Sequence, residues 1–394
     1  MNTLVPLPLT LYVHLPWCER KCPYCDFNSH PLKGDLPASA YIEGLLADLD
    51  AVGKLQSERR FGAVFFGGGT PSLFDGHQIA RILDQLDKGG CLDTEPEITI
   101  EANPGSAEAG RFRDYRDCGV NRLSLGVQSF NNQSLDALGR IHDGNDARKA
   151  CRAIADAGFE NFNIDLMHGL PGQNSADALA DLREALAGSP THLSIYQLTI
   201  EPNTAFAADP PSLPDEEVLW DIRCAIHDLA GAAGFEHYEV SAFARPERHC
   251  RHNLNYWEFG DYIGIGAGAH SKLSLDGVVY RWHRPRHPRE YLSTVAKDGI
   301  PELGPPLTPE ALRFEFLLNA LRLKAGFDYR LFEQRTGLVW SEQEALFESA
   351  VDDGLLLVDN ARVRTTPLGW RFLDDLLQRF LSPPEAPSAR DMMI

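Results

Sequence analysis

The 394-residue sequence lacks an excess of positive charge and a long apolar run. Its 37 Lys and Arg residues are outnumbered by 56 Asp and Glu residues, for a net charge of −19. This balance argues against a surface that follows a nucleic-acid backbone. No apolar stretch approaches the roughly 18 residues that a membrane span requires, and the opening MNTLVPLPLT lacks the pattern of a signal peptide. We therefore expect a cytoplasmic protein without a nucleic-acid partner or membrane insertion.

A disulfide framework is also missing, because the eight cysteines of this long chain are mostly scattered. Three of them, Cys18, Cys22 and Cys25, fall in CERKCPYC with no fourth cysteine nearby. Three thiolates cannot complete a tetrahedral metal site. The spacing fits a zinc site completed by His14 or His30, a redox dithiol, or a four-iron cluster with one iron open to another ligand. Spacing alone favours zinc and the cluster about equally.

The first half of the chain alternates strand-like and helix-like segments. Strands are predicted at 11–16, 63–70, 97–104, 122–130, 161–171 and 192–200. Helices are predicted at 38–55, 77–88, 107–117, 146–157 and 175–187. This alternation predicts βαβ units and a parallel sheet. Since six units are too few for an eightfold barrel and no doubly wound fingerprint is present, we predict an α/β fold with a partly open (β/α)6 barrel.

The second half predicts a smaller unit. We expect the barrel at 1–240, an extension that packs on it at 241–303, a C-terminal domain at 304–382 and a disordered tail at 383–394. Helix-like stretches continue at 215–233, 309–323, 341–352 and 368–381. A two-stranded ribbon around Asp359 and Asn360 is predicted between the last two of these helices, 341–352 and 368–381. Together they predict a winged-helix-like α+β domain.

Unusual residues stand at the predicted strand ends, where barrels of this kind place their catalytic and cofactor-binding residues. They are the GGGTP run at 67–71, Glu101, Gln128, Arg140 and Asp165. Each also has a simpler interpretation. The glycines could form a tight turn, Glu101 could be a solvated strand-end charge, and Asp165 could cap the following turn.

The cysteine pattern, with Tyr24 before its third cysteine, resembles the signature of the radical S-adenosylmethionine (SAM) family. In that family three cysteines hold a [4Fe-4S] cluster, and SAM binds its open iron. The resemblance implies that Cys18, Cys22 and Cys25 hold the cluster. It also implies a SAM site formed by Tyr12, Tyr24, Gly68, Gly69, Thr70, Glu101, Gln128, Arg140 and Asp165. In this set Arg140 suits the SAM carboxylate, because a guanidinium is a planar fork of donors.

A longer set of motifs resembles the coproporphyrinogen III oxidase-like proteins, almost end to end. The motifs include HLPWCERKCPYCDFNSH, FFGGGTPSLF, EANPG, LGRIH and DLMHGLPGQ. The oxygen-independent oxidase of this group has an N-terminal extension and a further cysteine two positions after the third. Here Phe27 occupies that position, and the first predicted strand begins near the chain start. The resemblance therefore implies the heme chaperone branch, without oxidase activity, and we assign no catalytic residue.

The segment CRHNLNYWEFGDYIGIGAGAH carries the second feature of this branch. His252 lies in an H-N-x-x-Y-W motif that the chaperone branch uses in heme binding. An imidazole can ligate heme iron, and Tyr256 and Trp257 can pack on the macrocycle. The alternative is a hydrogen-bonded core histidine. No ligand role is expected for His270, and the basic stretch 281–291 either meets heme propionates or is a solvated surface.

The resemblance thus predicts a heme chaperone that binds heme and transfers it to an acceptor hemoprotein, with SAM at the open iron of its cluster. The expected partners are heme, the acceptor and a reductant for the cluster. The alternatives are oxygen-independent coproporphyrinogen III oxidation and radical SAM modification of tRNA. A tRNA-modifying enzyme usually brings extra cluster cysteines or a basic RNA-binding domain, and this acidic chain shows neither.

Overall fold

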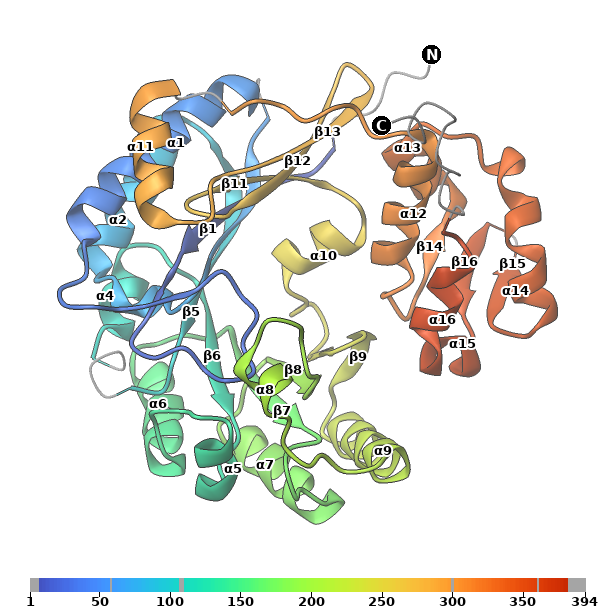
Figure 1. Cartoon of the computed structure of the whole chain (residues 1–394), viewed down its shortest axis with the longest axis horizontal. Coiled ribbons are helices and arrows are strands. Elements are labelled where there is room, and N and C mark those ends of the chain that lie inside the picture. The colour runs from blue at the N-terminus through green and yellow to red at the C-terminus, as the bar shows by residue number, and fades with distance from the viewer. Residues whose placement is uncertain (1–6, 57–58, 106–109, 299–300, 360, 382–394) are drawn as a thin grey trace, which may run out of the picture.

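In the computed structural model an eleven-stranded sheet curves into an open barrel (Figure 1). Its strand order is β13-β12-β11-β1-β4-β5-β6-β7-β8-β10-β9. The structure describes residues 7–56, 59–105, 110–298, 301–359 and 361–381. The predicted disordered tail, 383–394, lies outside these residues. Within the described chain the edge strands β13 and β9 do not pair, so the barrel is not closed.

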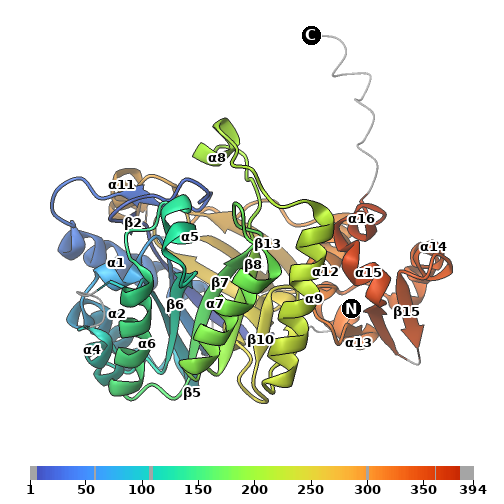
Figure 2. The same cartoon turned by 90° about the horizontal axis from the view of Figure 1, so that it is seen from below.

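Six neighbouring parallel strands form the centre of the sheet. They are β1 (Leu9–Leu15), β4 (Phe61–Gly68), β5 (Leu92–Ala102), β6 (Arg122–Gln128), β7 (Phe162–His168) and β8 (His192–Gln197). Helices cover the outside of the sheet (Figure 2): α1 (Ala38–Gln56), α2 (Gly76–Lys88), α4 (Phe112–Asp117), α5 (Asn132–Ala137), α6 (Gly144–Asp156) and α7 (Ser175–Ala187). The predicted α/β fold with six βα units is confirmed, although residues 107–109 of one predicted helix lie outside the described part.

Capping determines where several of these helices begin. Asp75, Asp143 and Asn174 each accept a hydrogen bond from the backbone N–H three residues later, and each closes a capping box. The apolar face of each helix then packs on strands that are buried on both sides.

Further strands extend the sheet on both sides. Beyond β1 lie β11 (Asp261–Ile265), which is parallel to it, and the hairpin of β12 (His270–Leu275) and β13 (Val278–His283). Beyond β8 lie β10 (Ala242–Ala244) and β9 (Glu236–Glu239). The segment 241–303 therefore adds strands to the barrel sheet itself. Helix α10 (Arg251–Trp257) lies in the barrel opening and packs on β1, β4 and β11 (Figure 1).

Helix α9 (Glu216–Ala232), which comes after β8, packs on α7 and buries Ile222, Ile226 and Ala230 in the barrel core. The remaining elements of this part are β2 (Trp17–Cys18), β3 (His30–Pro31), η1 (Pro71–Leu73), α8 (Ala205–Ala208) and α11 (Pro288–Asp298). Figure 2 shows α8 projecting beyond the ends of the sheet. None of the helices in the described residues is both long and apolar enough to cross a bilayer.

The C-terminal domain forms a second hydrophobic core. It contains α12 (Pro309–Ala320), β14 (Phe327–Asp328), α13 (Tyr329–Thr336), η2 (Trp340–Glu342), η3 (Glu344–Leu346), α14 (Glu348–Asp352), β15 (Leu356–Asp359), β16 (Arg362–Thr365), α15 (Pro367–Arg371) and α16 (Leu373–Gln378). The predicted ribbon is present as β15 and β16, and β14 adds a third strand. Phe259 and Val279 of the barrel part join this core, so the two parts pack together.

Two predicted helices of this domain are wrong in detail. The segment 341–352 is divided into 3₁₀ turns and the short α14, because packing of Trp340 and Phe347 on their aromatic neighbours overrides helical propensity. The segment 368–381 is split into α15 and α16 at Phe372, which leaves the helical conformation. The break lets the consecutive residues Leu376 and Leu377 both reach the core.

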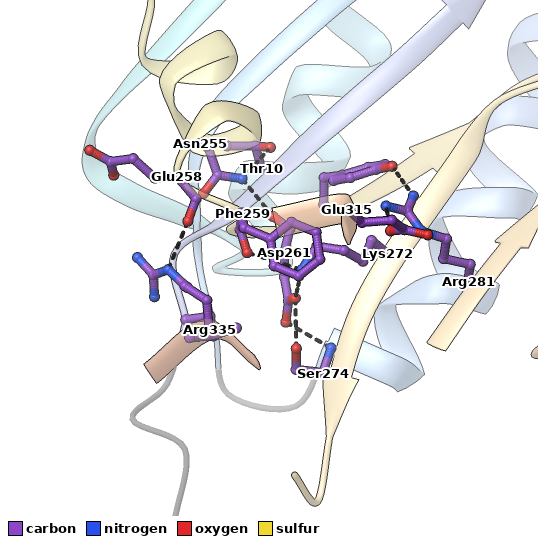
Figure 3. A network of polar contacts seen from close by, with 12 residues as sticks. Thr10, Asn255, Glu258, Phe259, Asp261, Lys272, Ser274, Arg281, Glu315 and Arg335 are labelled. Carbon is purple, nitrogen blue, oxygen red and sulfur yellow. Dashed lines mark hydrogen bonds and ion pairs between the residues drawn. The ribbon is translucent and has the colours of Figure 1, made fainter. Parts of the chain in front are cut away.

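A polar network joins the barrel sheet to the C-terminal domain (Figure 3). The buried Asp261 accepts hydrogen bonds from Lys272 at 3.0 Å and from Arg59 at 2.9 Å. Arg335 of α13 donates to the carbonyl of Glu258 at 3.0 Å (Figure 3). The domain is therefore held against the sheet by directional contacts as well as by apolar packing.

Candidate functional site

The three clustered cysteines lie on the loop that follows β1. Cys18 ends β2, and the N–H of Cys25 donates to the carbonyl of Cys22 at 3.2 Å, which tightens the loop. All three side chains are half-buried. Burial raises the pKa of the Cys18 and Cys25 thiols. The Arg140 guanidinium donates to the Cys22 sulfur at 3.6 Å.

The histidine proposed to complete a zinc site is engaged elsewhere. His14 Nδ1 lies 3.0 Å from the Tyr12 hydroxyl, and His14 Nε2 lies 2.9 Å from the carbonyl oxygen of Asn28. Both ring nitrogens are thus occupied by protein groups. The second candidate, His30, directs its Nε2 to the carbonyl of Arg286 at 3.3 Å. These contacts do not support the zinc interpretation.

The glycine run after β4 makes close approaches that a side chain would prevent. Gly68 has a φ of +123°, and a Cβ there would lie 2.6 Å from the His14 ring. A Cβ on Gly69 would lie 2.5 Å from the carbonyl oxygen of Trp17. The run is therefore more than a tight turn, because it brings bare backbone against the loop that carries the cysteines.

Thr70, Asn103 and Arg140 form a junction between three strand ends. Asn103 donates to the Thr70 hydroxyl at 2.9 Å and accepts from Arg140 at 2.6 Å. Arg140 also donates to the carbonyl of Gly126 at 2.8 Å. Together with Cys22, these three side chains line a small hollow of about 20 Å³ beside the cysteine loop. The sequence had indicated Thr70 and Arg140 but not Asn103.

Two carboxylates lie inside the barrel rim. Glu101 accepts from the N–H of Gly68 at 3.2 Å, and burial together with the charge of Asp165 raises its pKa to about 8. Asp165 accepts from Asn163 at 2.7 Å and from Ser124 at 3.3 Å. It therefore belongs to the polar interior of the barrel and does not cap the turn that follows it.

Two more of the predicted SAM residues, Gln128 and Tyr24, have distinctive surroundings. Gln128 has a φ of +71°, a left-handed conformation that is rare outside glycine, at an irregularity in the β6–β7 pairing. Such strain is typical of functional sites, and no sequence pattern announces it. Tyr24 packs in a small apolar cluster with Phe206, at a ring-centroid distance of 6.4 Å.

A cavity of about 700 Å³ opens beside this region, a volume typical of sites for small-molecule ligands and cofactors. Tyr12, Gly68 and Glu101 of the predicted SAM set line it. His14, Phe27 and Asn28, on β1 and in the segment after the third cysteine, also line it. The remaining wall residues come from a segment far away in the sequence: Tyr256, Tyr262, Gly268, Ala269, His270, His283 and Arg286. One cavity thus joins the predicted cofactor site to the strands that extend the sheet beyond β1.

His252 does not line this cavity. Its side chain is buried, 2% exposed, and its ring stacks on Phe65 at 4.9 Å and meets the Tyr256 ring edge-on at 4.7 Å. Burial and the charge of Arg122 lower the pKa of His252 to about 3, so its imidazole is neutral. The structure thus places the motif histidine in the core, and its role in heme binding stays a prediction.

The arginines of the basic stretch 281–291 have different surroundings. Arg281 pairs with Glu315, and Arg284 pairs with Asp48 inside the protein. Arg286 is the arginine of this stretch that lines the cavity. Sequence reasoning could not separate these arginines, because their partners lie far away in the chain.

The comparisons with known proteins agree with this geometry. The chain matches the family model of the radical SAM superfamily over residues 12–185 and that of the HemN C-terminal domain over residues 307–372. It is 46% identical to the heme chaperone HemW of Escherichia coli, over 95% of this chain and 98% of that protein. It is 44% identical to the Haemophilus influenzae heme chaperone HemW, with the same two coverages.

A solved structure also resembles this one. Coproporphyrinogen III oxidase (HemN) from Escherichia coli, described as a radical SAM enzyme, has a TM-score of 0.79 and 25% sequence identity. The similarity covers 95% of this chain and 90% of that chain. The barrel and the C-terminal domain are therefore both shared with HemN.

Proposed function

The chain belongs to the HemW family of heme chaperones within the radical SAM superfamily, and from this premise we propose that it binds heme and transfers it to an acceptor hemoprotein. The observation that carries the proposal is the full-length similarity to curated heme chaperones. A cavity of about 700 Å³ with aromatic walls beside the cysteine loop supports it, because a flat macrocycle packs well on aromatic rings.

The residues of the site fit the cofactors of the superfamily. Cys18, Cys22 and Cys25 would hold a [4Fe-4S] cluster, and their count leaves one iron for SAM. When bound, the cluster and SAM supply one-electron chemistry. The backbone at Gly68 and Gly69 packs directly against His14 and Trp17, where a Cβ would collide, and Gly68 also lines the cavity in which a ligand would lie.

The other predicted SAM residues would orient that ligand. Glu101 offers a carboxyl group for hydrogen bonds to a ribose or an ammonium group. Arg140 would hold the Cys22 sulfur in position through its hydrogen bond, and its contact with Asn103 would fix the turn that carries Thr70. These roles, like those of Tyr12, Tyr24, Gln128 and Asp165, belong to the proposal.

The partners follow from this chemistry. The cluster needs an external reductant, and the heme needs an acceptor hemoprotein. The net charge of −19 disfavours nucleic acid as a partner. We place the protein in the cytoplasm.

Assays on one preparation can distinguish heme transfer from the alternative function, coproporphyrinogen III oxidation. The anaerobically reconstituted protein is titrated with hemin, incubated with a heme-free acceptor, and assayed with SAM and coproporphyrinogen III. We expect stoichiometric hemin binding, faster acceptor activation than with free hemin, and no porphyrinogen oxidation. Porphyrinogen oxidation without hemin binding would instead identify an oxidase, the activity of the HemN structure that this fold resembles.

A further inference from the structure

A series of buried polar side chains crosses the interior of the barrel. Barrels of parallel strands usually fill this space with branched apolar side chains. Here Asn163 of β7 and His192 of β8 are register partners, and each is only 1% exposed. Asp165, inside the barrel rim, lies two residues further along β7. Because buried polar groups need hydrogen-bond partners, these side chains must find them within the barrel.

The amide of Asn163 fixes the direction of the hydrogen bonds. Its nitrogen donates to Asp165 at 2.7 Å and to Ser124 at 2.8 Å. Its oxygen therefore accepts from His192 Nδ1, which lies 2.7 Å away and carries the ring proton. Burial and the charge of Arg122 hold the pKa of His192 well below its ordinary value. The ring is thus neutral, and its Nε2 is an acceptor.

Tyr238 of β9 continues the series to α10. Its hydroxyl donates to His192 Nε2 at 2.8 Å and accepts from the backbone N–H of Cys250 at 3.4 Å. Cys250 is the residue that precedes the first turn of α10. Every donor therefore points the same way, from α10 through Tyr238 and His192 to Asn163 and Asp165. Hydrogen bonds aligned in this way polarise one another, so a change of charge at one end alters the bond at the other.

A second contact holds the start of α10 without belonging to this series. Glu97 of β5 accepts from the backbone N–H of Arg251 at 2.9 Å and from that of His252 at 3.3 Å. The first turn of α10 thus has two attachments to the barrel, a carboxylate and the Tyr238 hydroxyl. Of these two, the hydroxyl is the one that leads through hydrogen bonds to Asp165.

The Asp165 end of the series lies at the predicted SAM site. The charge of Asp165 acts on Glu101, which lines the cavity. Burial raises the pKa of Asp165. SAM carries an ammonium and a sulfonium group, and positive charge beside Asp165 favours its ionised form. Since a carboxylate is a stronger acceptor than a neutral carboxyl group, SAM binding should strengthen the hydrogen bonds that end at Asp165.

We propose that Asn163, His192 and Tyr238 are positioning residues that transmit SAM binding from Asp165 to the first turn of α10. The inference rests on the SAM site proposed above. Because α10 carries the H-N-x-x-Y-W motif, SAM occupancy would reach the helix that is expected to contact heme. It also gives a role to three side chains for which the sequence indicated none.

The test is hydrogen–deuterium exchange of the reconstituted full-length protein, with and without saturating SAM, read by mass spectrometry in peptides that cover 250–254. In wild type we expect SAM to slow this exchange severalfold. Tyr238→Phe removes only the hydroxyl and keeps the ring, which stacks on His249 at 4.2 Å. It should bind SAM as wild type does but lose the slowing. Asn163→Ala breaks the series at its other end and should lose the slowing too.

Two matched variants separate transmission from a merely structural role. Glu97→Gln weakens the other attachment of α10, so exchange should be faster throughout, yet SAM should still slow it. Tyr280→Phe removes a half-buried hydroxyl of β13 and should behave as wild type.

Three outcomes would overturn the inference. Equal slowing by SAM in wild type, Tyr238→Phe and Asn163→Ala would show that the series transmits nothing. A wild-type protein that binds SAM without any change in exchange at 250–254 would show the same. A wild-type protein that binds no SAM would refute the proposed SAM site itself, and calorimetric titration with SAM distinguishes this result from the first two.

Discussion

Arg281 of β13 donates to the Tyr262 hydroxyl at 2.8 Å. The same guanidinium pairs with Glu315 of α12 (Figure 3). Tyr262 lines the cavity, and α12 belongs to the C-terminal domain. One side chain thus links the wall of the proposed heme site to the small domain. The domain therefore has a route by which its position can affect the cavity.

Removing this link should loosen the cavity wall. We expect Arg281→Ala to lower the free energy of unfolding by about 1–2 kcal/mol, because Tyr262 and Glu315 both lose a partner in a half-buried setting. It should also weaken hemin binding severalfold. Urea denaturation and hemin titration measure both effects. Arg364→Ala, which breaks an exposed ion pair with Asp359, is the control and should change neither by much.

The buried pair of Asp261 and Lys272 should be strongly coupled. Both side chains are almost completely buried, at 0% and 1% exposure. Burial opposes ionisation of Asp261, but Lys272 and Arg59 outweigh it and hold its pKa below the usual range. Asp261→Asn should therefore destabilise the protein by about 3–5 kcal/mol, because it leaves the Lys272 ammonium buried without its counter-charge.

A double-mutant cycle with Lys272→Met tests the coupling of this pair. Urea denaturation of the two single variants and the double variant gives the three free energies of unfolding. The double variant should lose less stability than the sum of the single variants. Simple additivity would show that the pair is not coupled.

Glu101→Gln should change the pH dependence of stability. The folded protein holds a proton on Glu101 up to about pH 8, whereas the unfolded chain releases it near the ordinary pKa of 4.5. The free energy of unfolding therefore falls as the pH rises through this window. The glutamine variant should be more stable than wild type at pH 8, by about 1–3 kcal/mol, and similar to it at pH 4.5.

The same substitution should weaken SAM binding above about pH 8, where wild-type Glu101 is ionised, because a neutral amide is a poorer acceptor than a carboxylate. Urea denaturation at the two pH values and calorimetric titration with SAM measure the two effects. Glu217→Gln changes an exposed carboxylate of α9 and should leave both unaffected. An unchanged SAM affinity for Glu101→Gln would contradict the assignment of Glu101 to the SAM site.

The three cysteines of the loop should be individually required for iron. Replacing Cys18, Cys22 or Cys25 by alanine should abolish or greatly reduce the iron and sulfide bound after anaerobic reconstitution, since two thiolates do not hold the cluster stably. Cys224→Ala removes an exposed thiol on α9 and should retain full cluster content. A wild-type protein that bound zinc but no iron and sulfide would contradict the cluster assignment.

Local patterns in the sequence determined much of the architecture. Strand-like apolar runs and capped helices repeat at short range, so the six βα units and their order could be predicted without coordinates. The position of the strand-end residues could also be predicted, because the carboxyl ends of parallel strands meet at one rim of the barrel. Glu101, for example, was expected at the rim and does line the cavity.

Only the tertiary structure decided which distant residues meet. Arg140 reaches Cys22 across 118 positions of the chain, and Asn28 reaches Ala267 across 239. No spacing rule encodes such contacts, since they depend on how the whole sheet curves. For the same reason the sequence left open whether His252 is a heme ligand or a core histidine, and only the fold shows that it is buried while His270 and His283 line the cavity.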